Sequence, residues 1–340
     1  GIRGICVEAR PHPDFAGPGW WRDLDIVMDE AKQRGMRVWV LDDAHFPTGY
    51  AKGLIEKKYP NRKKTYINYN TVDVLGAQNE VMIHITPMLK PKTSWLDMDK
   101  PIDKEEQKNN KLISAVAAKL VTDGIINEEL IDLTDSVDGD FLTCTLPEGA
   151  WRIYVVYETK TDGGNPKYIN MIDEESVSTQ LEAVYQPHFE RYKEEFGKTF
   201  AGFFSDEPAF GNVNGFDFNE SIGRKEMPLP WSEEAKSLLL VALGEQWRVF
   251  LPFLWNNSEE MNQCVHTRYT YMDIVTRLYK KNFSDQLGNW CEGHHVEYIG
   301  HVIEDNDQHS RLGSGAGHFF RALSGQHMSG IDVIGGQVIF

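Results

Sequence analysis

The chain has 340 residues, of which 41% are hydrophobic and 25% charged, and this composition is ample for a large buried core. Lys and Arg number 35 against 51 Asp and Glu, which gives a formal net charge of −16. This acidic excess argues against a nucleic-acid partner and an anionic membrane surface, because both require clustered basic side chains. No apolar run reaches the roughly 18 residues of a membrane span, and no signal peptide is visible.

The first elements along the chain alternate between strand and helix. A short apolar run covers 4–9, and apolar residues then recur at helical spacing over 20–34. Gly35 is expected to end that helix, and a second apolar run over 37–42 predicts the next strand. This order of strand, helix and strand is typical of a parallel sheet or barrel.

The pattern becomes β-like between residues 64 and 160. Alternating or apolar segments cover 65–74, 80–86, 111–121, 141–146 and 151–158. Short strands separated by turn-forming residues predict a small β-sandwich. Residues 90–110 are rich in Lys, Asp, Asn and Pro, which predicts a surface loop.

The strand and helix pattern resumes after this region. Helical patterns cover 176–196, 232–255 and 264–291, and apolar strands cover 199–207, 295–305 and 331–340. This makes five barrel-type strands, where a complete (β/α)8 barrel has eight. The chain also begins without Met and directly in a strand, so we expect both ends to be cut.

These patterns together predict an α/β fold of the TIM type, a (β/α)8 barrel that is incomplete in this chain. An inserted small β-sandwich domain interrupts it. We expect residues 1–62 to form the first part of the barrel, 63–160 the insert, and 161–340 the catalytic continuation of the barrel.

Charged and polar residues stand at the ends of four of the predicted barrel strands or directly after them. They are Glu8, Arg10 and His12 after the first; Asp42, Asp43 and His45 after the second; Asp206 and Glu207 after the third; and Glu304 and Asp305 after the fourth. The active site of a parallel barrel lies at this end of its strands. Glycoside hydrolysis needs one carboxylic acid to protonate the leaving oxygen and one carboxylate to activate water or attack. We therefore predict a glycoside hydrolase with a carbohydrate substrate.

Glu207 is the predicted general acid. It follows Phe203 and Phe204, and shielding by aromatic rings raises the pKa of a carboxyl group. Glu304 is the predicted second carboxylate, and Gly300 in its strand would allow a neighbouring chain or ligand to approach closely. The residues predicted to bind substrate are Glu8, Arg10, His12, Asp42, Asp43, His45, Asp206, His301 and Asp305.

Structural roles remain open for several of these residues. Asp206 could cap a following helix, Glu304 could form a salt bridge, and each histidine could be structural. Asp305 and Asp307 could bind Ca²⁺, but two carboxylates in a loop are a weak signal. No H-E-x-x-H or G-x-S-x-G motif occurs. The cysteines are predicted to be buried free thiols: Cys6, Cys144, Cys264 and Cys291.

Three segments resemble glycoside hydrolase family 106, the α-L-rhamnosidases and their relatives. They are Val-Trp-Val-Leu-Asp-Asp-Ala-His-Phe-Pro-Thr-Gly-Tyr-Ala at 38–51, Phe-Phe-Ser-Asp-Glu-Pro at 203–208, and Tyr-Ile-Gly-His-Val-Ile-Glu at 298–304. The resemblance covers the barrel parts, roughly 1–60 and 165–340. It implies an inverting, Ca²⁺-dependent enzyme of bacterial polysaccharide degradation, with Glu207 as acid and Glu304 as base. A periplasmic or extracellular location is also implied, whereas the metal ligands are not assigned to particular residues.

Three alternatives stay open. A retaining β-glycosidase-like enzyme would use Glu304 as nucleophile, with carboxyl groups about 5–5.5 Å apart rather than about 6.5–9.5 Å. A non-catalytic carbohydrate-binding barrel would bind sugar without turnover. A metal-dependent hydrolase of other substrates would lose activity with a chelator. The sequence predicts neither the sugar and linkage nor the oligomeric state.

Overall fold

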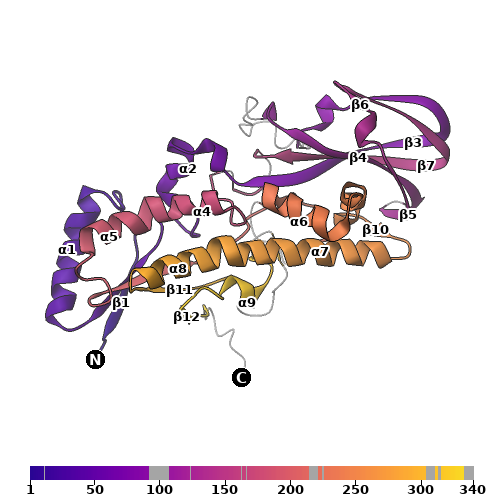
Figure 1. Ribbon diagram of the computed structural model, residues 1–340. Helices are drawn as coiled ribbons and strands as arrows, with labels where there is room; N and C mark the ends of the chain where they lie inside the picture. Colours follow the sequence, from indigo (N-terminus) through magenta and orange to yellow (C-terminus); the bar gives the residue numbers. More distant parts are fainter. Residues whose placement is uncertain are drawn as a thin grey trace. The chain divides into compact units, whose positions relative to one another are not determined.

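The computed structural model describes residues 1–10, 12–91, 107–122, 124–161, 163–165, 167–213, 221–223, 226–303, 311–312 and 315–332. The chain divides into two compact units, and each is discontinuous in sequence (Figure 1). The first unit comprises 1–64, 167–211 and 276–340, and the second comprises 65–166 and 212–275. Residues 212–275, assigned to the barrel from the sequence, thus group with the β-rich region.

The first unit is built on a parallel five-stranded sheet of order β1-β2-β8-β11-β12. Its strands are β1 (Gly4–Val7), β2 (Arg37–Leu41), β8 (Phe200–Asp206), β11 (Glu297–His301) and β12 (Met328–Ser329). Every neighbouring pair is parallel, so all carboxyl ends lie at one end of the sheet. The first four predicted strands are confirmed, whereas most of the predicted strand at 331–340 lies outside the described residues.

Helices connect these strands in the manner of a βα unit. Helix α1 (Pro18–Gln33) joins β1 to β2 and buries Trp20, Leu24, Met28 and Ala31, the face that the sequence periodicity predicted. The other helices with residues in this unit are η1 (Ala51–Gly53), α2 (Leu54–Lys57), η2 (Pro60–Arg62), α4 (Glu174–Gln180), η6 (Leu181–Tyr185), α5 (Gln186–Tyr192), α7 (Asn262–Tyr279), η8 (Lys280–Asp285), α8 (Gln286–Gly293) and α9 (Phe319–Ala322). Helix α7 has residues in both units.

Aromatic rings pack β8 against the helices before it. The ring of Tyr185 stacks on Phe203 at 4.1 Å between centroids, and Phe196 stacks on Phe200 at 4.5 Å. Phe200 and Phe203 are fully buried. Such contacts combine a large buried apolar area with specific ring geometry, so the first half of β8 is anchored by aromatic packing.

Strands β8 and β11 approach each other unusually closely. A Cβ atom on Gly300 would lie 2.3 Å from the carbonyl oxygen of Ser205, and one on Gly202 would lie 1.8 Å from that of Glu297. Both glycines have positive φ, +155° and +154°. The close approach predicted at Gly300 is therefore confirmed, and its partner is the neighbouring strand.

Among the four cysteines, the predicted burial is correct for three and wrong for one. Cys144, Cys264 and Cys291 are buried free thiols, whereas Cys6 is exposed. Cys6 lies in β1, an edge strand whose only neighbour among the described strands is β2.

The second unit contains a seven-stranded sheet of order β10-β5-β4-β7-β3-β9, with β6 paired to β7. Its strands are β3 (Thr65–His84), β4 (Lys111–Thr122), β5 (Ile125–Asp132), β6 (Val137–Asp138), β7 (Phe141–Thr159), β9 (Leu229–Trp231) and β10 (Asn257–Ser258). The helices are η3 (Thr86–Met88), η5 (Thr134–Ser136), α6 (Glu233–Leu243) and η7 (Trp247–Leu254). No single helix in the described ranges is long and apolar enough to cross a membrane; α6 and η7, bent by 108°, meet that test only as a pair.

The predicted β-sandwich is not confirmed, because the described strands of this region form one sheet. Leu142 and Trp151 lie nine residues apart in β7 and yet share a hydrophobic core with Ala115 and Leu133. The register of β3 against β7 shifts near Gly76, and such irregularities bend strands. One curled sheet therefore encloses the core that two packed sheets were expected to enclose.

We predict that Gly300→Ala lowers the free energy of unfolding by about 2–4 kcal/mol, because the new Cβ meets backbone and the φ is unfavourable. Urea denaturation measures this change. Gly293→Ala is the matched control, since its Cβ would have no heavy atom within 4 Å. The control should change stability by less than about 1 kcal/mol, and an equal loss in both variants would contradict the close-approach argument.

Candidate active site

The carboxyl ends of β8 and β11 bring predicted site residues together with the loop after β1. One Arg10 amino group donates a hydrogen bond of 2.9 Å to Asp206 Oδ2. The other carboxylate oxygen of Asp206 lies 3.2 Å from Nε2 of His301. Arg10 also forms an ion pair with Glu8. Four residues predicted from three strand ends thus form one connected network.

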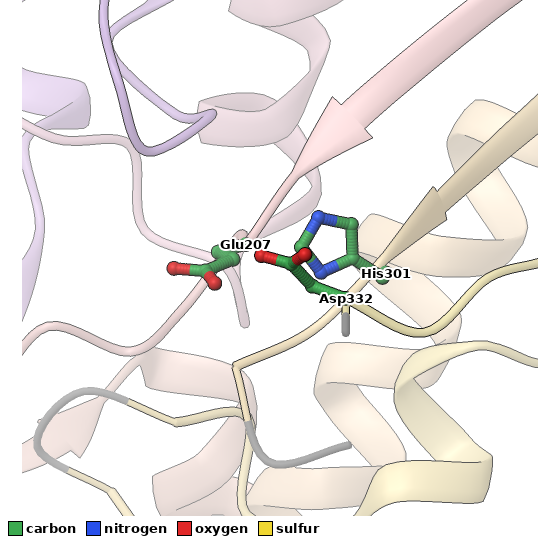
Figure 2. Close-up of side chains that lie close together, drawn as sticks. All are labelled: Glu207, His301 and Asp332. Atoms are coloured by element: carbon green, nitrogen blue, oxygen red, sulfur yellow. The ribbon is translucent and has the colours of Figure 1, made fainter. Parts of the chain in front are cut away.

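Glu207 follows β8 directly and has a left-handed backbone, with φ of +46°. This conformation is uncommon for a residue with a side chain and is tolerated where the surroundings impose it. The side chain is half-buried. The turn at Glu207 follows the end of the strand, and the Glu207 side chain lies close to those of His301 and Asp332 (Figure 2).

Glu207, His301 and Asp332 form a cluster at the ends of three neighbouring strands. One carboxylate or imidazole ligand atom from each lies within 4.8 Å of the others. Figure 2 shows the three side chains close together. This spacing permits the three residues to share a proton, a hydroxyl group or a cation.

Asp332 is absent from the residues predicted from the sequence. It lies within the segment 331–340 that was assigned to a strand, whereas the strand of the structure, β12, ends at Ser329. Asp332 therefore occupies the same place as the other site residues, just after the carboxyl end of a barrel-type strand. A correct strand boundary would have identified it.

His301 is buried beside these acids, with 8% of its surface exposed. Burial lowers the pKa of an imidazole, but the hydrogen bond to Asp206 and the charges of Asp206, Glu207 and Asp332 raise it. The net effect raises the pKa of His301 above its usual value of 6.5. A protonated His301 would bring a positive charge to the site at neutral pH.

Asp42 is fully buried and accepts hydrogen bonds from three hydroxyl groups. Thr48 donates at 2.6 Å, Tyr185 at 2.8 Å, and Ser205 also donates. Burial raises the pKa of the Asp42 carboxyl to about 7, although each of these hydrogen bonds lowers it. The carboxylate has no exposed surface, and its contacts are those of a residue that joins β2 to β8.

Asp43 is also fully buried and organises the loop that follows β2. Its two carboxylate oxygens accept five backbone N–H groups at 2.6–3.0 Å, from Ala44, Gly49, Tyr50, Ala51 and Lys52. The predicted contact of Asp42 and Asp43 with substrate remains a prediction, and in the structure both acids stabilise the rim from within.

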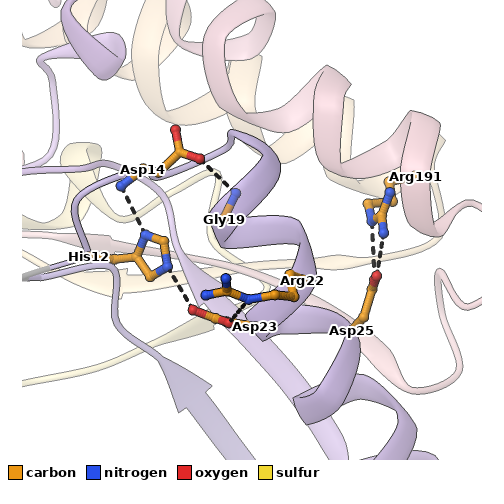
Figure 3. Close-up of polar contacts among 7 residues, drawn as sticks. All are labelled: His12, Asp14, Gly19, Arg22, Asp23, Asp25 and Arg191. Carbon is orange, nitrogen blue, oxygen red and sulfur yellow. Dashed lines mark hydrogen bonds and ion pairs between the residues drawn. The ribbon is translucent and has the colours of Figure 1, made fainter.

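His12 and His45 occupy different environments. The amide of Asp14 donates to Nδ1 of His12 at 3.1 Å, and Nε2 of His12 lies 3.2 Å from Asp23 (Figure 3). Since Nδ1 accepts a hydrogen bond, the ring hydrogen lies on Nε2 and His12 holds the loop after β1. The same figure shows Arg191 of α5 paired with Asp25 of α1. His45 is exposed, with its ring 5.7 Å from that of Tyr50.

Glu304 and Asp305 lie outside the described residues. The role predicted for Glu304 as second carboxylate therefore remains a prediction, as does the contact of Asp305 with substrate. The strand that delivers them is present: β11 ends at His301, three residues before Glu304.

A cleft of about 600 Å³ opens beside this network, between the loops after β1 and β2. Its lining residues are Arg10, His12, Pro13, Asp14, Phe15, Ala44, His45, Lys52 and Lys57. Arg10 belongs both to the cleft and to the Asp206 network. A ligand in the cleft would thus reach residues in contact with the strand end that carries Glu207.

Among solved structures, the chain is similar to the rhamnosidase from Novosphingobium sp. PP1Y, with a TM-score of 0.54 and 11% sequence identity. The likeness covers 92% of this chain and 43% of that chain, so this chain spans less than half the length of the rhamnosidase. No protein-family model matches the chain, and no curated protein matches it in sequence. The likeness shows that this chain shares its fold with part of that structure, whereas the resemblance to family 106 has no support from a family model.

We predict that Asp206→Asn lowers the pKa of His301, because it removes the hydrogen bond and the nearest charge that oppose burial. An NMR titration of the histidine ring protons measures this shift. Asp23→Asn is the control, since Asp23 contacts His12 and should leave His301 unchanged. An unchanged His301 titration in Asp206→Asn would show that Asp206 does not set this pKa.

We predict that Asp42→Asn removes a pH dependence from stability. The pKa of the Asp42 carboxyl is about 7 in the folded protein and about 4 in the unfolded chain. The wild-type free energy of unfolding should therefore fall as pH rises from about 4 to 7 and level off above. Relative to Asp42→Asn, the wild type should lose about 2–3 kcal/mol between pH 5 and pH 8.

Urea denaturation at several pH values measures this difference. Asp29→Asn, an exposed position on α1, should follow the wild-type profile in parallel. Parallel profiles for Asp42→Asn and the wild type would mean that Asp42 ionises at the same pH folded and unfolded.

Proposed function

We propose that this chain is the catalytic part of a glycoside hydrolase that removes a terminal sugar, α-L-rhamnosyl being the first candidate. The carrying observation is Glu207, which a left-handed turn at the end of β8 places beside His301 and Asp332. The fold shared with part of a rhamnosidase supports the same class of reaction. We further propose that the parallel sheet belongs to a (β/α)8 barrel, whose active sites lie at this end of the strands.

In this proposal Glu207 protonates the glycosidic oxygen as the sugar leaves. Glu304 acts as general base, and water attacks the anomeric carbon from the opposite face with inversion. Asp206 is a positioning residue, since it holds His301 and Arg10 on either side of the strand end. His301 and Asp332 set the electrostatic environment of the Glu207 carboxyl, and Arg10 with Glu8 faces the substrate side.

The calcium ion that the family resemblance implies does not fit the cluster described above. Ca²⁺ takes six to eight oxygen ligands, whereas this cluster offers two carboxylates and one imidazole nitrogen. An imidazole with carboxylates suits Zn²⁺, Mn²⁺ or Fe²⁺ better. We therefore assign no step of the glycosidase mechanism to calcium.

The same donor set favours a second candidate function, a metal-dependent hydrolase of other substrates. A divalent ion held by Glu207, His301 and Asp332 would lower the pKa of a bound water. The two functions make opposite demands on Glu207, because a carboxylate that binds a cation does not carry the proton of a general acid. Activity that a chelator abolishes and Zn²⁺ or Mn²⁺ restores, without glycoside turnover, would favour the second function.

We predict that Glu207→Gln lowers the turnover of an aryl α-L-rhamnoside by about 10²-fold or more. Turnover is measured by release of the aryl group, with other aryl glycosides tested in parallel and with Ca²⁺ added or removed. Glu292→Gln, an exposed acid on α8, is the matched control and should retain full activity. Sugar binding by the wild type without turnover of any glycoside would favour a non-catalytic carbohydrate-binding protein.

The configuration of the released sugar separates the inverting mechanism from its retaining alternative. NMR of the anomeric proton early in the reaction records which anomer forms first. Inversion requires Glu304 to act through water, whereas retention requires it to act as nucleophile.

A further inference from the structure

The cleft beside the catalytic network carries positive charge, in a chain whose net charge is −16. Three side chains of its lining are basic, namely Arg10, Lys52 and Lys57, against the single carboxylate of Asp14. Acidic residues outnumber basic ones in the whole chain. The cleft is therefore lined by more basic than acidic side chains, which is the opposite of the balance in the whole chain.

The charges of the cleft differ in how far the protein itself neutralises them. Arg10 is paired with Glu8 and Asp206. Asp14 accepts a hydrogen bond of 2.6 Å from the amide of Gly19, which ties its carboxylate to the start of α1. Lys57 is exposed and has no ion-pair partner within the part of the chain that the structure describes. An anion in the cleft would thus find Lys57 available.

Lys52 faces the same space from a fixed position. Its ammonium group donates a hydrogen bond of 2.7 Å to the carbonyl of Ala16 and retains two further N–H donors. Burial lowers the pKa of Lys52, the charge of Asp14 raises it, the charge of Lys57 lowers it, and the net direction is downward. Lys52, Asp14 and Lys57 all line the cleft.

The backbone that presents these cations is held in a costly conformation. Ala16, Ala51 and Lys52 have left-handed φ values of +49°, +48° and +54°. The carboxylate of Asp43 holds the amides of Ala51 and Lys52 in place. Strained positions that the surrounding structure imposes are typical of ligand-binding sites, where they fix donors in advance.

We propose that this cleft binds the anionic group of an acidic glycan, a uronate carboxylate or a sulfate ester, on the sugar next to the one that Glu207 protonates. The inference rests on the proposed function and specifies its substrate class. Lys57 and Lys52 would bind the anion, and Arg10 would join it to the Asp206 network. Charge-assisted hydrogen bonds of this kind discriminate strongly against an uncharged analogue.

Calorimetric titration of the full chain with matched oligosaccharides tests the proposal. The first pair is a tetrasaccharide of galacturonic acid and its fully methyl-esterified form, in which each carboxylate is replaced by an uncharged ester. The second pair is a sulfated galactose tetrasaccharide and its desulfated form. We expect one anionic form to bind at least about 10-fold more tightly than its uncharged match, and the preference to weaken with salt. The pair that shows the preference identifies the anion.

Variants of an exposed lysine separate the cleft from the rest of the surface. Lys57→Gln should reduce the preference for the anionic form, and Lys57→Glu should abolish it. Lys193→Glu makes the same change of net charge on an exposed lysine that does not line the cleft, and should keep the preference. Equal binding of charged and uncharged forms, absence of binding, or a preference that survives Lys57→Glu would overturn the proposal.

Binding is measured without turnover, so the two proposals fail separately. Preferential binding of the anionic form without hydrolysis of any glycoside would overturn only the proposed function. Hydrolysis with no preference between charged and uncharged forms would overturn only the anionic cleft.

Discussion

The buried carboxylate of Asp42 is the contact on which the architecture of the site depends. Asp42 follows β2, Thr48 lies in the loop beyond it, Tyr185 ends η6, and Ser205 lies in β8. One side chain thus joins two strands, a loop and a helix. Removing a buried hydrogen-bonded acceptor leaves several donors without a partner, which is far more costly than losing one exposed contact.

This contact also fixes the strand end that carries the candidate catalytic residues. Thr48 binds Asp42 through its hydroxyl hydrogen, and its oxygen accepts the amide of Asp206 at 2.9 Å. The amide of Thr48 in turn donates to the carbonyl of Asp206 at 2.9 Å. Asp206 therefore has its backbone held on both sides, and the unusual turn at Glu207 follows from a fixed point. Positioning of this kind is what a catalytic carboxyl group requires.

Much of this arrangement could be predicted from the sequence, because it follows from periodicity. Apolar runs gave the parallel strands, and the carboxyl ends of parallel strands meet at one edge. That rule alone was enough to bring Arg10, Asp206 and His301 to one place. The same rule shows why Asp332 was not predicted. The sequence placed Asp332 inside a strand at 331–340, whereas β12 ends at Ser329 and Asp332 follows its carboxyl end.

Other features could not be predicted, because they depend on partners distant in the sequence. An acid after a strand can face substrate or be buried, and the sequence around Asp42 is the same in both cases. Asp42 is buried and accepts hydrogen bonds from Tyr185 and Ser205, which are more than 140 residues away in the sequence. Similarly, alternation of apolar residues is the same in a curled sheet and in a sandwich. The bend near Gly76, where β3 and β7 lose their register, decides between them.

The chemistry of the site depends on whether Glu207 carries a proton or binds a cation. His301 bears on both outcomes, because its protonated form would bring a positive charge beside Glu207 and Asp332, as a metal ion would. Asp206 favours that protonated form through its hydrogen bond, and Arg10 holds Asp206 in place through a hydrogen bond of 2.9 Å. The same hydrogen bond would also orient a neutral His301 and raise its basicity as a metal ligand, so the Arg10–Asp206–His301 chain supports either state of the imidazole. A positive charge beside a carboxyl group favours its ionised form, so an imidazolium opposes the proton of a general acid just as a metal ion would, and the acid role of Glu207 is favoured by a neutral His301. Arg10 thus extends its influence from the cleft, through Asp206, to the proton on His301.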